Sequence, residues 1–271
     1  MVDDMKIGVV GCAGRMGQMV VRQITETEGC VVAGGTEPAG NPAVGADIGT
    51  LAGLEPFGVL VTDDPAAMIA AVDAVIDFTV PAATAEHARL AAQAEAVLVA
   101  GTTGLDAKQE EAVTLAARHV PVIRAPNFSI GVTLLLALTE QVAGILGPDY
   151  DIEVVEMHHR HKVDAPSGTA IGLGEAAAAG RGVDLDAVRK SGRDGHTGAR
   201  PSGEIGFATL RGGDVVGDHT VVFAGEGERL ELTHKAASRQ VFAAGAVRAA
   251  LWGRGRPAGL YSMKHVLGFA D

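Results

Sequence analysis

The residues best suited to chemistry lie in one stretch, from Glu156 to Thr169, which reads Glu-Met-His-His-Arg-His-Lys-Val-Asp-Ala-Pro-Ser-Gly-Thr. Its basic part, 158–162, holds three histidines, an arginine and a lysine in a chain that is otherwise acidic. Histidine can donate a proton near neutral pH. Ser167, Gly168 and Thr169 are typical of a first helical turn, whose hydroxyls and backbone N–H groups can seat a carboxylate. The stretch therefore predicts a site that binds a small dianion and protonates it.

Two other interpretations of this stretch remain open: a solvated basic turn, and a Zn²⁺ site built from the three histidines. Successive residues of a strand point to opposite faces, so His158 and His159 should diverge and take different roles. No nearby carboxylate pattern matches a known zinc-ligand spacing. We therefore expect no metal, and we expect Lys162 to act as a fixed cation with three donors.

A glycine turn near the start of the chain predicts a dinucleotide site. The turn Gly11-Cys-Ala-Gly-Arg-Met-Gly17 joins an apolar run at 6–10 to residues with helical spacing. In dinucleotide folds such a turn lets backbone N–H groups hold the pyrophosphate. The spacing is G-x-x-G-x-x-G rather than G-x-G-x-x-G, so a turn that only packs closely is the alternative.

The residue at the end of the second expected strand, 30–36, is Glu37, twenty positions after Gly17. An acid at this place binds the ribose hydroxyls in dinucleotide folds, although a solvated loop acid is the other interpretation. Pro38 follows, so no basic residue stands beside Glu37 to bind a 2′-phosphate. NADH is therefore favoured over NADPH, although Arg15 could still reach a phosphate.

Strands expected at 73–78, 96–100 and 120–125 alternate with helices at 81–94 and 106–119, which predicts a parallel sheet with helices on both faces. Ligands bind at the carboxyl ends of such strands. Each residue at these ends could also be an ordinary turn residue. The candidate cofactor-binding residues, from the glycine turn to the nicotinamide side, are Gly11, Cys12, Ala13, Gly14, Arg15, Met16, Glu37, Phe78, Gly101, Thr102, Thr103, Ala125, Pro126, Asn127 and Phe128.

The second half of the chain predicts a different domain. The expected elements are helices at 130–146, 167–180 and 238–252, strands at 151–157, 204–210, 215–224 and 229–235, and a short final helix within 260–267. We expect 39–60 to be a loop and 181–203 to be a long structureless loop, typical of a lid, a subunit contact or disorder.

These elements predict an α/β chain with two domains. A Rossmann-type dinucleotide-binding domain should comprise 1–129 plus 239–271. An α+β domain with a large mixed sheet, 130–238, should bind the substrate and form oligomers, because an open sheet face needs to be covered.

The composition argues against several classes of protein. The chain has 271 residues and a net charge of −11, which argues against nucleic acid or an anionic membrane as a partner. With Cys12 and Cys30 alone there is no disulfide framework, which fits a reducing compartment. The N-terminus lacks a signal-peptide pattern, and no apolar run approaches the roughly 20 residues of a membrane span. We therefore expect a cytoplasmic protein with a small-molecule substrate.

Several motifs resemble those of the 4-hydroxy-tetrahydrodipicolinate reductase (dihydrodipicolinate reductase) family of the diaminopimelate–lysine pathway. The resemblance covers nearly the whole chain, through the glycine turn, Gly101-Thr-Thr-Gly104, Asn127-Phe-Ser129, 156–170, 195–198, 205–208 and 233–236. It implies hydride transfer from NAD(P)H to C4 of a cyclic dicarboxylate, with loss of the 4-hydroxyl as water.

The resemblance also implies roles for single residues. His158 matches the proton donor, Lys162 the catalytic lysine, and His159, Gly168 and Thr169 carboxylate-binding positions. A homotetramer through the second domain is implied as well. Some members carry arginines where this chain has Pro38 and Val80, which leaves NADH, with NADPH as a second possibility, as the expected cofactor.

The residues alone identify a nicotinamide-dependent reductase of a small dianion. A dehydrogenase of an amino-acid semialdehyde or of aspartate shares the two-domain plan, and turnover of an aldehyde or α-amino substrate would favour it. A non-catalytic NAD(P)H sensor would bind the cofactor without needing His158 and Lys162.

Overall fold

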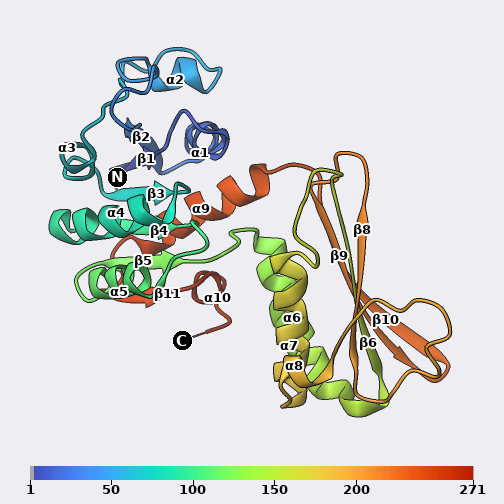
Figure 1. Ribbon diagram of the computed structural model, residues 1–271. Helices are drawn as coiled ribbons and strands as arrows, with labels where there is room; N and C mark the ends of the chain where they lie inside the picture. Colours follow the sequence, from blue (N-terminus) through green and yellow to red (C-terminus); the bar gives the residue numbers. More distant parts are fainter. Residues whose placement is uncertain (1–2, 271) are drawn as a thin grey trace. The chain divides into compact units, whose positions relative to one another are not determined.

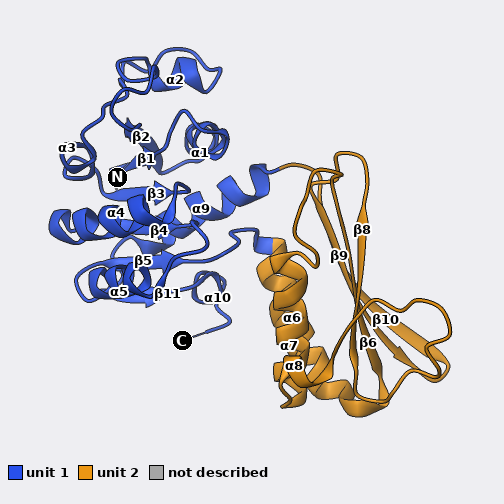
Figure 2. Cartoon of the chain, in the orientation of Figure 1, with its two compact units in different colours: residues 1–130, 239–271 blue, residues 131–238 orange. Residues whose placement is uncertain are grey.

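A parallel sheet of short apolar strands forms the centre of the first part of the chain. The computed structural model describes residues 3–270 (Figure 1). It divides into unit 1, up to residue 130 and from 239 onward, and unit 2, 131–238 (Figure 2). The sheet of unit 1 has the order β11-β5-β4-β3-β1-β2, and all its neighbouring strands are parallel, which confirms the Rossmann-type expectation. Its strands are β1 (Met5–Val10), β2 (Cys30–Thr36), β3 (Ala74–Asp77), β4 (Val97–Ala100), β5 (Pro121–Arg124) and β11 (Gly259–Tyr261).

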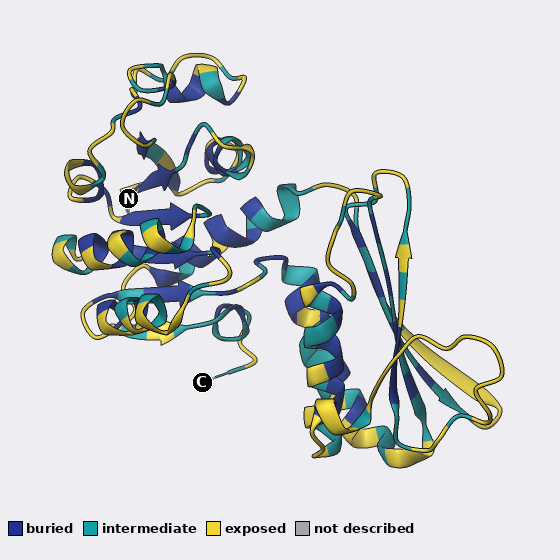
Figure 3. Cartoon of the chain, in the orientation of Figure 1, coloured by how far each residue is buried: buried dark blue, intermediate teal, exposed yellow. Residues whose placement is uncertain are grey.

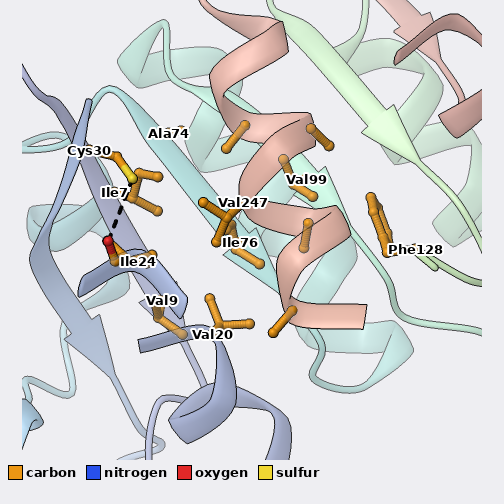
Figure 4. Close-up of a cluster of buried hydrophobic side chains, with 14 of the residues drawn as sticks. Ile7, Val9, Val20, Ile24, Cys30, Ala74, Ile76, Val99, Phe128 and Val247 are labelled. Atoms are coloured by element: carbon orange, nitrogen blue, oxygen red, sulfur yellow. Dashed lines mark hydrogen bonds between the residues drawn. The ribbon is translucent and has the colours of Figure 1, made fainter. Parts of the chain in front are cut away.

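Successive residues of these strands pack into two different apolar layers, as a sheet covered on both faces requires. In β3, Ile76 belongs to the core formed with α1 and α9, whereas Val75 belongs to the core formed with α3, α4 and α5. Figure 4 shows the first core, where Val20 and Val247 meet strand residues. The helices are α1 (Arg15–Thr25), α2 (Ile48–Leu51), α3 (Pro65–Ile69), α4 (Pro81–Ala94), α5 (Ala107–Ala116), α9 (Gln240–Gly253) and α10 (Met263–Val266).

The glycine turn lets α1 start directly against the end of β1. Gly11 has a φ of 68°, which lies in the left-handed region that glycine tolerates. A Cβ at Gly17 would lie 2.1 Å from the carbonyl oxygen of Gly11, so any larger residue would push the helix away from the strand. The glycines at both ends of the turn are therefore required by its geometry.

Unit 2 is a mixed sheet covered by two long helices. The strand order is β10-β9-β6-β8-β7, with β6 parallel to β8 and antiparallel to β9, which confirms the expected mixed sheet. The helices are α6 (Ile130–Leu146), α7 (Gly168–Arg181) and α8 (Leu185–Val188), with a 3₁₀ turn η1 (Gly147–Asp149). The strands are β6 (Asp151–His158), β7 (Arg189–Ser191), β8 (Ile205–Arg211), β9 (Gly217–Gly225) and β10 (Glu228–Ala236).

The two faces of this sheet differ in their cover. Leu135 of α6 and Leu173 of α7 pack with Val154 and Phe223 of the sheet in one core. On the other face, Leu210 is 50% exposed. Val155, Met157 and Val222 of that face are half-buried, and Figure 3 shows long exposed stretches on β10. Unit 2 thus has one buried sheet face and one open sheet face that carries an apolar patch.

The expectation of a structureless loop at 181–203 was wrong for 185–191, which form a short helix and a strand, whereas 192–203 contain neither, as expected. Asp184 caps α8 by accepting a hydrogen bond from the backbone N–H of Asp186, and Leu185 enters the core of unit 2. β7 then pairs in parallel with β8, starting at Arg189 opposite Ile205. The polar composition hid these elements because both are very short and one is an edge strand.

Two further segments differ from expectation. Within 39–60, the side chain of Asp47 accepts hydrogen bonds from the N–H groups of Thr50, Phe57 and Gly58 and so holds the short helix α2. Near the end of the chain, β11 joins the sheet beside β5 before α10 begins, where a single helix was expected. α3 was not predicted.

Helix α6 and the turn after it, Ile130–Asp149, are long and apolar enough to cross a membrane by length and composition. The expectation that no apolar run approaches this length was therefore wrong. Core helices of globular proteins pass the same test, and Leu135 and Ala143 of α6 lie in the core of unit 2. This helix by itself is weak evidence for a membrane span.

Candidate active site

Unit 1 has a cavity of about 320 Å³ at the carboxyl ends of its strands. The rings of Phe78 and Phe128 meet edge to face there, with centroids 5.7 Å apart. Arg239 and Phe242 also line the cavity and were not predicted, although they lie at the start of an expected helix. The predicted cofactor residues that line it are Met16, Phe78, Gly101, Thr103, Pro126, Asn127 and Phe128.

A second cavity of unit 1, of about 440 Å³, lies beside the glycine turn. Gly11, predicted for the pyrophosphate turn, and Glu37, predicted for the ribose hydroxyls, both line it. Pro38 and Val80 contribute neutral side chains to its wall, where arginines would attract a 2′-phosphate. The further lining residues are Thr36, Asp63, Pro65, Thr79, Ala83, Glu86 and His87.

Glu37 holds the glycine turn in place. One carboxylate oxygen accepts a hydrogen bond from the backbone N–H of Ala13 at 2.7 Å, and the other accepts one from the side chain of Asn41 at 2.8 Å. α1 begins after Gly14, which makes no side-chain cap, and Gly14 and Arg15 are exposed. An open helix start, a glycine turn and cavities at the strand ends are features that a dinucleotide requires, so these residues fit NAD(P)H.

Three predicted cofactor residues have buried side chains that do not line either cavity. Cys12 packs in the core of unit 1, and burial, with the nearby charge of Glu37, raises the pKa of its thiol to about 12. Ala125 is 5% exposed, and Thr102 is 6% exposed. Cys12 and Ala125 can therefore take part in cofactor binding only through their backbone groups.

The carboxylate of Asp77, which was not predicted, joins the ends of β3 and β4. It accepts hydrogen bonds from the hydroxyl of Thr79 at 2.6 Å and of Thr102 at 3.3 Å, and lies 2.8 Å from Nδ1 of His87. Burial alone would raise the pKa of Asp77, but the hydrogen bonds from His87 and Thr79 outweigh it and hold the pKa below its usual range. The network fixes the strand ends on which the cavities are built.

In unit 2, β6 places Glu156 and His158 on one face of the sheet, because strand residues alternate. Both are buried, whereas His159 is half-buried. Nδ1 of His158 lies 2.6 Å from a carboxylate oxygen of Glu156. An ionised carboxylate only accepts hydrogen bonds, so Nδ1 carries the proton and Nε2 is left as the nitrogen that can transfer one.

Three other donors bind the carboxylate of Glu156. Arg211 donates to both oxygens, at 2.8 and 3.0 Å, and the backbone N–H of Ser167 donates at 3.0 Å. Burial alone would raise the pKa of Glu156, but the hydrogen bonds from Arg211 and His158 outweigh it and hold the pKa below its usual range. The carboxylate is therefore ionised at neutral pH. Arg211 was not predicted, since only the sheet register brings it here.

Ser167 is the N-cap of α7. Its hydroxyl accepts a hydrogen bond from the N–H of Ala170 and lies 3.1 Å from Nε2 of His219. Ser167 is only 2% exposed, so in this structure its side chain holds the start of the helix. The helix itself begins with Gly168 and Thr169, whose backbone N–H groups lie in its first turn.

His219 is a second buried histidine of this cluster that was not predicted. Its ring meets that of His158 edge to face, with centroids 5.1 Å apart. Burial, together with the smaller effect of the neighbouring His158, lowers the pKa of His219 to about 4. The ring is therefore neutral at physiological pH. An alternating strand pattern with one histidine on its inner face was the signal available in the sequence.

Lys162 lies in the turn after β6. Its Nζ is 2.8 Å from a carboxylate oxygen of Asp164, and its side chain is 21% exposed. The hydrogen bond from Lys162 is the main reason that the pKa of Asp164 is lowered. Among residues 3–270, no group of three or more His, Cys, Asp or Glu side chains is arranged to hold a metal ion.

The cluster combines groups of complementary chemistry within unit 2. It offers an oriented imidazole at His158, a cation at Lys162 and the start of a 14-residue helix at Gly168. Helix starts and cations bind carboxylates, and an oriented imidazolium can protonate a reacting group.

Comparisons with known proteins agree along the whole chain. A family model described as dihydrodipicolinate reductase, N-terminus, matches residues 5–128, and one described as dihydrodipicolinate reductase, C-terminus, matches residues 131–267. The 4-hydroxy-tetrahydrodipicolinate reductase of Parvibaculum lavamentivorans is 59% identical over 269 residues, which cover 99% of both chains. The protein of that name from Methylocella silvestris is 56% identical over 268 residues, covering 99% of this chain and 98% of its own.

The chain is also similar to a solved structure of a dihydrodipicolinate reductase. The dipicolinate-bound dihydrodipicolinate reductase from Paenisporosarcina sp. TG-14 is 25% identical to this chain and has a TM-score of 0.76. The match covers 96% of this chain and 97% of the other.

His219 should make the folded protein less stable as the pH falls from 6.5 to about 4. In this window an unfolded histidine binds a proton while the buried ring stays neutral, so protons favour unfolding. The shift corresponds to a loss of at most about 3 kcal/mol in the free energy of unfolding. In His219→Gln this contribution should vanish, so urea denaturation at pH 6.5 and 4 should give a smaller difference than in the wild type.

His119→Gln is the matched control, because it replaces an exposed histidine of unit 1. It should leave the pH dependence unchanged. A pH dependence in His219→Gln equal to that of the wild type would show that the buried ring does not contribute.

Proposed function

This chain belongs to the dihydrodipicolinate reductase family, and from that premise we propose that it reduces 4-hydroxy-tetrahydrodipicolinate to tetrahydrodipicolinate with NAD(P)H in diaminopimelate and lysine biosynthesis. It is an oxidoreductase with a dinucleotide-binding unit. The observation that carries the proposal for the chemistry is the contact of one buried carboxylate, Glu156, with both the imidazole of His158 and the start of α7. A dicarboxylate that must be protonated requires such a pair of groups.

We propose that His158 is the proton donor. When bound, the dihydronicotinamide supplies a hydride to C4 of the substrate. The balance then requires one proton, which leaves with the 4-hydroxyl as water. The imidazolium of His158 can donate it from Nε2, while Nδ1–H stays bonded to Glu156.

We propose that the two carboxylates of the substrate bind around the start of α7. The N–H groups of Gly168 and Thr169 lie at the positive end of the helix dipole. Lys162 and His159 can add a charged and a polar contact, because both lie in or next to the turn that follows β6. The cation of Lys162 would also balance the negative charge that the substrate brings.

Lys162→Ala should lower kcat by about 100-fold, because a positioned cation acts on the charge of the reacting substrate. The dissociation constant for NADH, measured by fluorescence, should change less than about twofold, since Lys162 belongs to unit 2. Lys190→Ala, which removes an exposed lysine of the same unit, should leave both quantities unchanged. Near-normal turnover of Lys162→Ala would contradict the assignment.

The assay should generate the substrate in place from pyruvate and aspartate semialdehyde with a synthase. Oxidation of NADH that depends on the synthase supports the reductase. NADH binding without oxidation would instead favour a sensor, and oxidation that needs only an aldehyde or an α-amino substrate would favour a dehydrogenase.

We propose that NADH is preferred and that NADPH is the weaker cofactor. Two acids, Glu37 and Asp63, line the second cavity of unit 1 and would repel a 2′-phosphate, whereas the charge of Glu86 in the same lining is paired with Arg89. Pro38 and Val80 offer no charge in compensation.

Pro38→Arg should therefore improve NADPH binding by about 10-fold, since a charge-assisted contact to a phosphate is worth about 1.5 kcal/mol or more. NADH binding should change little. Pro56→Arg adds the same charge at an exposed position of unit 1 away from the cavity lining and should have no effect. Unchanged NADPH affinity in Pro38→Arg would show that the 2′-phosphate is bound elsewhere.

We propose a homotetramer that uses the open sheet face of unit 2. This proposal is supported by Leu210, which is 50% exposed, by Met157 opposite it, and by Val155 and Val222, which are half-buried on the same face. An exposed apolar patch of this kind is typical of an interface.

Leu210→Asp should break the tetramer, because a charge would be buried in the interface. Light scattering should give about four times the chain mass of 27.6 kDa for the wild type and a smaller mass for the variant. Ile145→Asp changes a 73% exposed residue of α6 in the same unit and should keep the wild-type mass. A wild type that is monomeric at micromolar concentration would refute the proposal.

A further inference from the structure

The surroundings of Glu156 go beyond what a buried ion pair needs. Arg211 alone neutralises the charge with two parallel hydrogen bonds. The same carboxylate nevertheless binds Nδ1 of His158 and the backbone N–H of Ser167. These two groups belong to the end of β6 and to the start of α7, which supply the proton donor and the anion seat of the proposed reaction.

Arg211 extends this network to the turn that carries Lys162. One of its nitrogens donates to the backbone carbonyl of Asp164 at 2.6 Å, and Asp164 in turn pairs with Lys162. The other donates to its own neighbour, Leu210, also at 2.6 Å. Three segments with proposed roles, the end of β6, the turn after it and the start of α7, are thus joined through Glu156 and Arg211.

His219 closes the network from the other side. It pairs with Glu156 across the antiparallel strands β6 and β9, meets the ring of His158 edge to face and lies beside the hydroxyl of Ser167. Because burial keeps the His219 ring neutral, it adds no charge that would compete with Arg211 for the carboxylate.

We propose that Glu156 is a positioning residue that fixes His158 as the Nδ1–H tautomer and holds the start of α7 in register with it. This inference rests on the proposed function, since it assigns the proton donor and the anion seat to that reaction. A carboxylate accepts from Nδ1–H, which leaves Nε2 to carry the proton that is transferred. The bond to the Ser167 N–H fixes the distance between this donor and a bound carboxylate. Neither effect requires Glu156 to touch the substrate.

Glu156→Gln tests this role with almost no change in shape. The amide group would present an NH₂ to Nδ1 of His158 in place of an acceptor, so the ring proton should move to Nε2. We expect kcat to fall at least 10-fold, because His158 would no longer be held with Nδ1 protonated and Nε2 placed to carry the proton that is transferred. The NADH dissociation constant should change less than twofold. Nitrogen-15 NMR of labelled histidines should find the neutral His158 as Nδ1–H in the wild type and as Nε2–H in the variant.

A double variant separates positioning from a purely structural role. If Glu156 acts through His158, Glu156→Gln combined with His158→Ala should be no more than about twofold slower than His158→Ala alone. Multiplicative losses would overturn the inference, as would a wild-type tautomer and wild-type kcat in Glu156→Gln. Glu175→Gln, an exposed change on α7, is the matched control and should behave as wild type.

Two further outcomes, a variant that does not fold and a wild type that does not turn over the substrate, can be told apart from the results above. If Glu156→Gln does not fold, Glu156→Asp keeps the charge but withdraws the carboxylate from Nδ1 by one methylene, so kcat should fall and NMR should find that the neutral His158 is no longer held in the Nδ1–H form alone. If the wild type binds NADH but does not turn over the substrate, the proposed function fails. The tautomer of His158 in the wild type still decides the inference then, because the Nε2–H form would overturn it.

Discussion

The carboxylate of Glu156 is ionised although only 1% of the residue is exposed. A buried charge is costly unless its hydrogen bonds are satisfied, and here Arg211, His158 and Ser167 all donate to it. The end of β6 and the start of α7 are therefore constrained by one acceptor. The imidazole of His158 acquires a defined tautomer from this constraint, so the local chemistry of unit 2 depends on it.

Unit 1 solves a similar problem with Asp77. Parallel strands bring their carboxyl ends to one edge of the sheet, where the short turns after them must keep a fixed shape to form a cavity. The hydrogen bonds that Thr79, Thr102 and His87 make to the buried carboxylate of Asp77 hold those turns in place. In both units a buried acid with several donors supports a site without lining the part that a ligand would fill.

Local patterns in the sequence predicted most of the architecture. Alternating apolar runs and helical spacing identified the Rossmann-type sheet of unit 1 and the mixed sheet of unit 2. They failed where elements are very short, at α8, β7 and β11, because three or four residues give no periodicity. The glycine turn and the basic stretch were visible because each is contiguous in sequence.

The sequence by itself determined the order of elements, the family and the stretches that carry His158, Lys162 and the glycine turn. Only the tertiary structure decided which distant groups complete them. Arg211 lies opposite His158 across the parallel pair β6–β8, and His219 lies opposite Glu156 across β6–β9. These partners depend on strand register, which is set by the packing of whole sheet faces rather than by any local residue pattern. A hydrogen-bond network built across strands is therefore a property of the fold.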